Sequence, residues 1–100
     1  MHGTVSTIDL SAAAAKDIEA ILDQSVAEFG LLRAEKYYES LKRCLELLSE
    51  NPGMGTTADN VRPGYRRFSH ESHVVFYRLS ESGILVVRVL HARMDVGWHF

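Results

Sequence analysis

The chain has 100 residues and a mass of 11.2 kDa, which predicts a single domain spanning residues 1–100. Hydrophobic residues make up 46% and charged residues 24% of the chain, which excludes an intrinsically disordered protein. Its apolar runs are far shorter than the roughly 20 residues that a membrane-spanning helix needs. The one cysteine, Cys44, excludes a framework of internal disulfides and fits a reducing compartment.

Charge is divided unevenly along the chain, although the formal net charge is only −2. Residues 1–60 hold five Lys or Arg and ten Asp or Glu, whereas residues 61–100 hold six Arg, no Lys and three acids. The planar guanidinium group suits carboxylates and phosphates. We therefore expect the C-terminal part to attract an acidic partner. We expect no membrane partner, and no sequence-specific binding of nucleic acid by this chain alone.

The first half of the chain predicts a short strand followed by two helices. β-Branched residues over positions 4–10 favour the strand, and Ser11 stands where a helix N-cap belongs. Apolar residues then recur every three or four positions over 12–29 and again over 31–50. Gly30 separates the two helices, which are therefore expected to form an antiparallel hairpin.

The second half predicts a loop and three strands. Residues 51–64 are rich in Gly, Thr, Asn and Pro and indicate the loop. Strands are predicted at 65–69, 73–79 and 84–92, with a hairpin turn before the last of them. The strand at 84–92 is apolar on both faces, so we expect it inside the sheet.

The predicted order of elements is therefore β-α-α-β-β-β, which is an α+β fold. The helical hairpin must pack against one face of the sheet, because neither layer can bury its apolar side alone. We expect an antiparallel sheet whose other face is left open.

Several short motifs follow one another along the chain, and together they span residues 8–95. They are Ala14-x-x-Asp17-Ile18-x-x-Ile21, Gly30-x-x-x-Ala34-x-x-Tyr37-x-x-x-Leu41, Asn51-Pro52-Gly53-Met54-Gly55, Arg62-Pro63-Gly64-Tyr65-Arg66-Arg67, His73-Val74-Val75-Phe76-Tyr77-Arg78 and Val86-Val87-Arg88-Val89-Leu90-His91-x-Arg93-Met94-Asp95. Each motif is weak alone, but the ordered set is specific. On these motifs the chain resembles the ParE-type toxins of bacterial type II toxin–antitoxin pairs, within the RelE/ParE superfamily.

The resemblance implies a small cytoplasmic protein that inhibits DNA gyrase by binding, with neither catalysis nor a cofactor. It also implies a hetero-oligomer with a cognate ParD-like antitoxin, which neutralises the toxin. The superfamily allows an alternative function, a ribosome-dependent mRNA endonuclease of the RelE kind. A third possibility is a toxin-like binding module that is not toxic.

Four arginines are candidate antitoxin contacts: Arg66, Arg67, Arg78 and Arg88. Arg78 and Arg88 are expected to point the same way from paired strands, on the open face of the sheet, and the register decides whether Arg66 or Arg67 joins them. Such a cluster suits an acidic antitoxin segment or a phosphate-bearing target. The alternative is that Arg78 pairs with Glu71 or Glu81 and that Arg88 lies along a sheet edge.

Three aromatic residues of the hairpin are candidate anchors for an antitoxin helix: Phe29, Tyr37 and Tyr38. Tyr37 and Tyr38 are adjacent and cannot point in one direction, so we expect one in the core and the other at a rim. Phe29 stands at the tip of the hairpin and can stay partly exposed. The alternative for all three is ordinary core packing.

The C-terminal residues are candidate target contacts: His91, Arg93, Trp98 and Phe100. Trp98 and Phe100 lie beyond the last strand, so they either fold back on the core or stay exposed for a partner. We expect them to fold back while the antitoxin is bound.

The endonuclease alternative requires an acid, a base and cations around the scissile phosphate. The residues available for these roles are His91, Arg88, Arg93 and Tyr77. Trp98 and Phe100, near the end, cannot transfer a proton. The sequence therefore favours a binding mechanism, with His91 capping the last strand or bonding to Asp95.

No metal or cofactor site is expected. The pair His70-x-x-His73 has ligand-like spacing but lacks a local third ligand. Cys44 belongs to the apolar stripe of the second predicted helix, so we expect it in the core as a small apolar residue.

Overall fold

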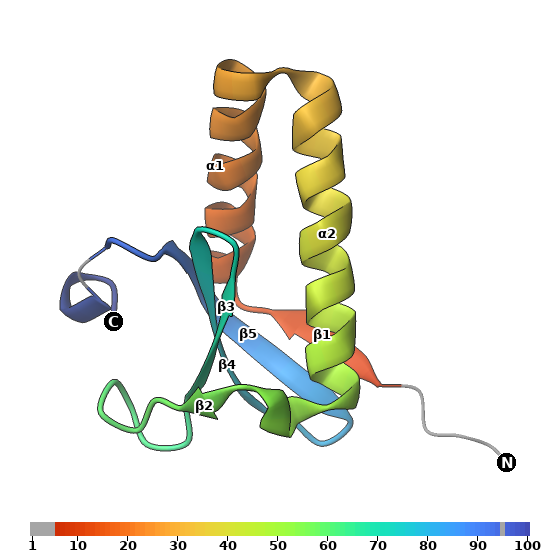
Figure 1. Ribbon diagram of the computed structural model, residues 1–100. Helices are drawn as coiled ribbons and strands as arrows, with labels where there is room; N and C mark the ends of the chain where they lie inside the picture. The colour runs from red at the N-terminus through yellow and green to blue at the C-terminus, as the bar shows by residue number, and fades with distance from the viewer. Residues whose placement is uncertain (1–5, 95) are drawn as a thin grey trace, which may run out of the picture.

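The computed structural model describes residues 6–94 and 96–100, in which two long helices stand side by side above a twisted sheet (Figure 1). The predicted order of the main elements is confirmed, with one addition, a two-residue strand inside the predicted loop. Residues 4 and 5 of the predicted first strand lie outside the described residues. The elements are β1 (Thr7–Leu10), α1 (Ala12–Phe29), α2 (Leu31–Glu50), β2 (Thr56–Thr57), β3 (Arg66–His70), β4 (His73–Leu79) and β5 (Gly83–His91), with 3₁₀ turns at Pro52–Met54 and Val96–Trp98.

The strands form one sheet in the order β1-β5-β4-β3-β2. β5 lies inside the sheet, as its apolar sequence predicts. The pairs from β2 to β5 are antiparallel, but β1 runs parallel to β5, so the sheet is mixed. No tight turn joins β1 to its neighbour; nearly the whole chain lies between them. This long connection permits the parallel direction, which the strand pattern alone does not specify.

The start of α1 is fixed by Ser11, as predicted. Its Oγ accepts a hydrogen bond from the Ala14 N–H at 2.9 Å and donates one to the Val87 carbonyl at 2.8 Å. The cap therefore also ties α1 to β5. Gly30 alone joins α1 to α2, and its φ of 87° lies in the left-handed region that glycine adopts without strain.

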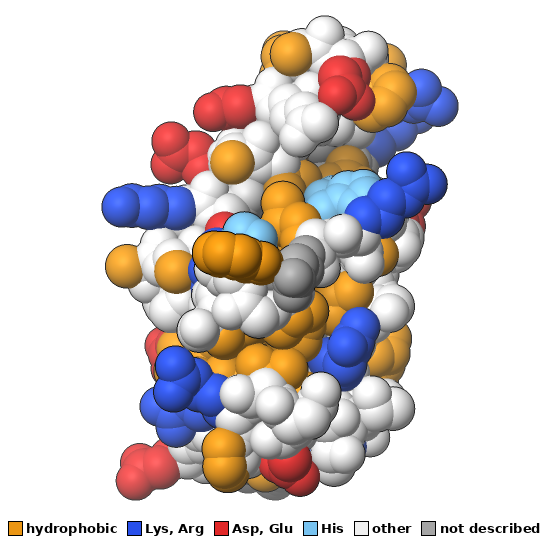
Figure 2. All heavy atoms as spheres, turned by 90° about the vertical axis from the view of Figure 1, so that its left-hand side faces the viewer, with side chains coloured by type: hydrophobic (Ala, Val, Ile, Leu, Met, Phe, Trp, Pro, Cys, Tyr) orange, Lys and Arg blue, Asp and Glu red, His pale blue; other side chains and the backbone are white. Residues whose placement is uncertain are grey.

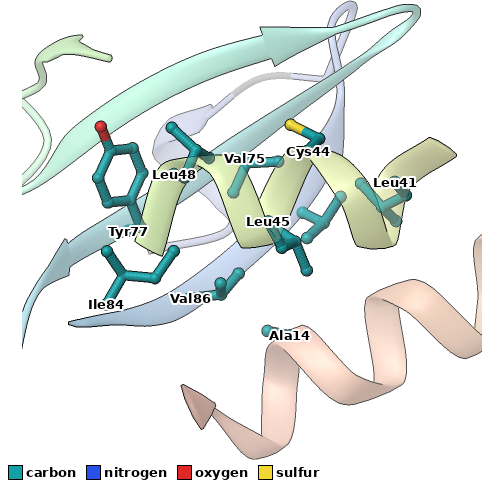
Figure 3. Packing of buried hydrophobic residues seen from close by; sticks show 10 residues of the cluster. Ala14, Leu41, Cys44, Leu45, Leu48, Val75, Tyr77, Ile84 and Val86 are labelled. Carbon is teal, nitrogen blue, oxygen red and sulfur yellow. The ribbon is translucent and has the colours of Figure 1, made fainter. Parts of the chain in front are cut away.

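The main core lies between the helical hairpin and one face of the sheet (Figure 3). Leu41, Leu45 and Leu48 of α2 point onto side chains of β4 and β5. Cys44 is 7% exposed in this core, and burial raises the pKa of its thiol, so it is the inert core residue that the sequence predicts. Ala14 is fully buried on α1 beside this core.

The opposite face of the sheet is not left open as expected, because it carries a second apolar cluster. Val74, Phe76, Val87 and Leu90 point to this side and are each at most 9% exposed. Residues 58–65 and the C-terminal segment cover them, through the side chains Ala58, Val61, Tyr65, Val96 and Phe100. The sheet is thus covered on both faces, because both faces of β4 and β5 are apolar.

Tyr77 connects the sheet to the segment that follows α2. The residue is fully buried, and its hydroxyl donates to the Pro52 carbonyl at 2.5 Å and accepts from the Gly55 N–H at 3.0 Å. A side chain at position 55 would collide with this hydroxyl and with the Arg67 carbonyl. The close approach of Gly55 therefore allows both hydrogen bonds.

Replacing Tyr77 with phenylalanine should lower the free energy of unfolding by about 1–3 kcal/mol, because the buried Gly55 N–H and the half-buried Pro52 carbonyl lose their partner. Urea denaturation followed by circular dichroism measures the change. Tyr38→Phe is the matched control, since Tyr38 is 44% exposed. Equal midpoints for the two variants would show that the Tyr77 hydroxyl contributes nothing.

Candidate partner-binding surfaces

The end of the helical hairpin exposes large apolar side chains, and we call it the hairpin end. It consists of Val26, Phe29, Leu31 and Leu32, which are 41%, 56%, 63% and 69% exposed. The hairpin projects well beyond the sheet, so the sheet cannot cover these residues (Figure 1). Gathered exposed apolar side chains of this size are typical of protein-binding surfaces.

The two adjacent tyrosines of α2 point in different directions, as predicted. Tyr37 is half-buried against the main core, and its hydroxyl lies 2.7 Å from His73 Nδ1. Burial and the charge of Glu71 raise the pKa of Tyr37 to about 12. Tyr38 is the more exposed of the pair, so it is the one available to a partner.

A groove of about 600 Å³ lies between the hairpin and the adjoining ends of β4 and β5. Ile21 and Phe29 of α1 and Tyr37 of α2 supply its apolar lining. His73 and His91 line it from the sheet. The groove thus continues the apolar surface of the hairpin end and has room for side chains of a bound segment.

Three histidines gather beside this groove. His73 and His91 face each other across β4 and β5 with ring centroids 5.5 Å apart, and Tyr37 contacts the rings of both His70 and His73. Ser40 Oγ lies 2.7 Å from His70 Nε2. Burial lowers the pKa of His73, and its two histidine neighbours lower it further, while Glu71 opposes them.

The lowered pKa of His73 predicts that the protein loses stability in mild acid. The unfolded chain takes up a proton near pH 6.5 and the folded chain only at lower pH, so the free energy of unfolding falls as the pH drops through this range. Urea midpoints at pH 7.5 and 5.5 measure the loss. His73→Gln should reduce the difference between them, and an unchanged difference would assign the pH dependence to other groups.

Arg88 is not a free cation of an open sheet face, which corrects the prediction for this residue. Its Nε and Nη2 donate to the two carboxylate oxygens of Asp17, each at 2.7 Å, and its Nη1 donates to the His99 carbonyl at 2.7 Å. Asp17 also accepts the Val89 N–H at 3.0 Å. The hydrogen bond to Asp17 raises the pKa of Arg88, although burial opposes the shift. Arg88 therefore joins α1, β5 and the C-terminal segment.

Arg66 and Arg67 are separated by the register of β3 against β4. Arg66 lies opposite Tyr77, on the side of the sheet that faces the helices, and its Nη2 donates to the Gly55 carbonyl at 2.5 Å. Arg67 lies opposite Phe76 on the other side, with its guanidinium carbon 5.4 Å from the centre of the Phe76 ring. The register of β3 against β4 thus places Arg67, and not Arg66, on the face away from the hairpin.

Arg78 shares that face with Arg67, since its register partner is Leu85 of the second cluster. It is exposed, and within the described residues it forms no ion pair, so the alternative of a pairing with Glu71 or Glu81 is not observed. Arg62 is also exposed and lies in the segment that covers the second cluster. Sequence reasoning did not select Arg62, although it opens the motif that contains Arg66 and Arg67.

The two C-terminal aromatic residues behave differently. Phe100 folds back, with its ring centroid 5.1 Å from that of Phe76 and 5.8 Å from that of Tyr65. Trp98 is 85% exposed. His91 Nδ1 accepts the Arg93 N–H at 3.1 Å and so caps the strand end, while the alternative bond to Asp95 lies outside the described residues.

The residues of the endonuclease alternative do not come together at an exposed site. Tyr77 is fully buried with its hydroxyl engaged, and Arg88 is paired with Asp17. His91 points to the side of the sheet that faces the helices, where it meets His73. Tyr77, Arg88 and His91 therefore do not form one exposed set of acid, base and cation.

Metal-binding and membrane-spanning features were also sought in the described part of the chain. Among residues 6–94 and 96–100, no three His, Cys, Asp or Glu side chains are arranged to hold a metal ion. Neither long helix in that part of the chain combines the length and the apolar character needed to cross a membrane.

Comparison with known proteins identifies the family. Residues 8–96 match the family model described as the ParE toxin of the type II toxin–antitoxin system parDE. The chain belongs to the ParE toxin family. Toxin ParE1 of Mycobacterium tuberculosis strain H37Rv is 43% identical over 88 residues, which cover 87% of this chain and 90% of that protein. Toxin ParE1 of Caulobacter vibrioides is 39% identical over 90 residues, which cover 90% of this chain and 93% of that protein.

The ParE fold is also found in a solved structure from the chromosomal ParDE toxin–antitoxin system of P. aeruginosa. The two chains align with a TM-score of 0.74 at 21% identity, over 89% of this chain and 98% of the other. This similarity confirms the fold. The family resemblance of the ordered sequence motifs is likewise confirmed.

In this ParE chain the predicted contacts divide between two surfaces. Phe29 and Tyr38 are exposed on the hairpin, whereas Arg67 and Arg78 lie on the far side of the sheet. Arg66, Arg88 and Tyr37 are engaged in internal hydrogen bonds.

Proposed function

We propose that this ParE chain is a cytoplasmic toxin that inhibits DNA gyrase by binding, without catalysis. We further propose that a cognate ParD-like antitoxin neutralises it by occupying the hairpin end and the adjoining groove. The observation that carries the proposal is the family match over residues 8–96, together with relatives named as toxins that align over about nine-tenths of their length.

The hairpin end and its groove support the position of the antitoxin. Phe29 belongs to both, because it is 56% exposed and also lines the groove. An amphipathic segment could place apolar side chains against Phe29 and Tyr37 and polar ones toward solvent. Burying such aromatic residues at the centre of an interface supplies much of its binding energy.

A binding mechanism is supported by what the site residues do in the fold. Arg88 and Tyr77 are candidate residues of the endonuclease alternative, but in the fold they form internal hydrogen bonds to Asp17 and to the Pro52 carbonyl. Trp98 is exposed beside this framework and remains a candidate contact for the target, with Arg93. Inhibition through contacts of this kind requires no acid or base.

The proposal is tested by adding the purified chain to gyrase and relaxed plasmid. We expect loss of supercoiling at micromolar concentrations or below, and recovery when the cognate antitoxin is added first. Absence of inhibition at a large molar excess of active, soluble chain would contradict the gyrase target. Inhibition that the antitoxin does not relieve would contradict its role as the neutralising partner.

Induction of the chain in bacteria separates the alternatives. Gyrase inhibition predicts a DNA-damage response and filamentation while protein synthesis continues. An immediate block of translation would instead support the RelE-type endonuclease. Normal growth with soluble protein that still binds the antitoxin would support a non-toxic binding module.

A further inference from the structure

The side of the sheet opposite the hairpin presents three arginines above the second apolar cluster, and we call it the arginine face. It consists of Arg62, Arg67 and Arg78. Arg67 of β3 lies opposite Phe76 of β4, and Arg78 follows Phe76 by two residues on β4. Arg67 and Arg78 are therefore diagonal neighbours on one face of the sheet, roughly 7–8 Å apart. Figure 2 shows basic side chains on either side of an apolar band on this side of the molecule.

These three arginines form no ion pair within residues 6–94 and 96–100. Asp59 is the acid within residues 58–65, which cover part of the second cluster, and its carboxylate accepts a hydrogen bond from the Gly64 N–H at 2.8 Å. The three positive charges are therefore not neutralised by ion pairs within the described residues. An acidic partner would supply the missing counter-charges, and planar guanidinium groups above apolar side chains suit carboxylates flanked by apolar residues.

The arginine face also differs in shape from the antitoxin surface. The groove proposed for the antitoxin is lined by residues of α1 and α2 on the other side of the sheet. The arginine face instead rests on a packed cluster, with Arg67 held over the Phe76 ring. The groove has room for the side chains of a bound segment, whereas a packed face suits the complementary surface of a folded protein.

We propose that the arginine face docks an acidic surface of the enzyme that the toxin inhibits. The inference rests on the proposed function, because it requires a protein target. A protein is favoured over nucleic acid because the arginines stand over an apolar cluster, which a phosphate backbone would leave unused. The net charge of −2 also differs from the strongly basic charge that is typical of nucleic-acid-binding domains.

The test compares Arg62→Gln, Arg67→Gln and Arg78→Gln with Lys42→Gln, an exposed cation on α2 that serves as the matched control. For each, inhibition of gyrase supercoiling and affinity for the cognate antitoxin are measured. We expect the double variant Arg62→Gln/Arg78→Gln to need at least tenfold more protein for half inhibition, with antitoxin affinity within twofold of wild type. Raised salt should weaken inhibition by the wild type more than by this variant.

Each other outcome has a definite meaning. Unchanged inhibition by folded variants would overturn the docking proposal alone, while a wild-type chain inert toward gyrase would overturn the proposed function and this inference together. A tenfold loss of antitoxin affinity would assign the face to the antitoxin. Arginine-dependent binding of a DNA duplex without the enzyme would make it a nucleic-acid surface. Arg67 contacts Phe76, so its variant is interpreted only beside the exposed positions 62 and 78.

Discussion

Replacing Asp17 with alanine should lower the free energy of unfolding by about 2–4 kcal/mol. The change removes the carboxylate that accepts from Arg88 and from the Val89 N–H, and it leaves the guanidinium without its counter-charge. The expected loss is below that of a fully buried pair, because the Arg88 and Asp17 side chains keep 21% and 14% of their exposure. Urea denaturation followed by circular dichroism measures it.

Asp23→Ala is the matched control, because Asp23 is an exposed acid on the same helix. It should change the midpoint little. Replacing both partners, as Asp17→Leu with Arg88→Leu, should cost less than the sum of the single losses, since no charge is then left unpaired. A variant at position 17 as stable as the Asp23 control would show that the pair does not hold the fold together.

Replacing Phe29 and Leu32 together with serine should weaken binding of the cognate antitoxin by roughly 30-fold or more. Both side chains are more than half exposed on the hairpin end, so the free protein should keep nearly its full stability. The lost affinity reflects apolar area that the antitoxin no longer buries. Calorimetric titration measures it, and co-expression should leave the variant toxic when the wild type is neutralised.

Leu79→Ser is the matched control for this surface. Leu79 is 58% exposed at the end of β4, away from the hairpin end. It should leave antitoxin affinity unchanged. If the hairpin variant and this control bind the antitoxin equally well, the hairpin end is not the antitoxin surface.

Local chemistry explains why the sequence predicted the helical hairpin so well. Ser11 provides a side-chain cap, Gly30 supplies a left-handed φ, and apolar residues recur at helical spacing on both sides of it. The inner position of β5 was also predictable, because a strand that is apolar on both faces must be covered on both. These features depend on residues close together in the chain.

The contacts of the arginines could not be predicted from neighbouring residues in the chain. A register shift between Phe76 and Tyr77 interrupts the β4–β5 pairing, and Arg88 next to it bonds to Asp17 instead of joining Arg78. No spacing along the sequence announces this pair, since its members are 71 residues apart. The same limit applies to the second cluster, whose cover comes from residues 58–65 and the C-terminus.

The sequence by itself determined the order of elements, the hairpin, the apolar core positions and, through its ordered motifs, the toxin family. Those features follow from local backbone preferences and periodic burial, which each segment carries alone. Only the tertiary structure decided which arginines are engaged inside the protein and which face a partner. The reason is that a guanidinium group is satisfied by whatever carboxylate or carbonyl the folded chain brings within about 3 Å, and that meeting depends on strand register and helix placement together.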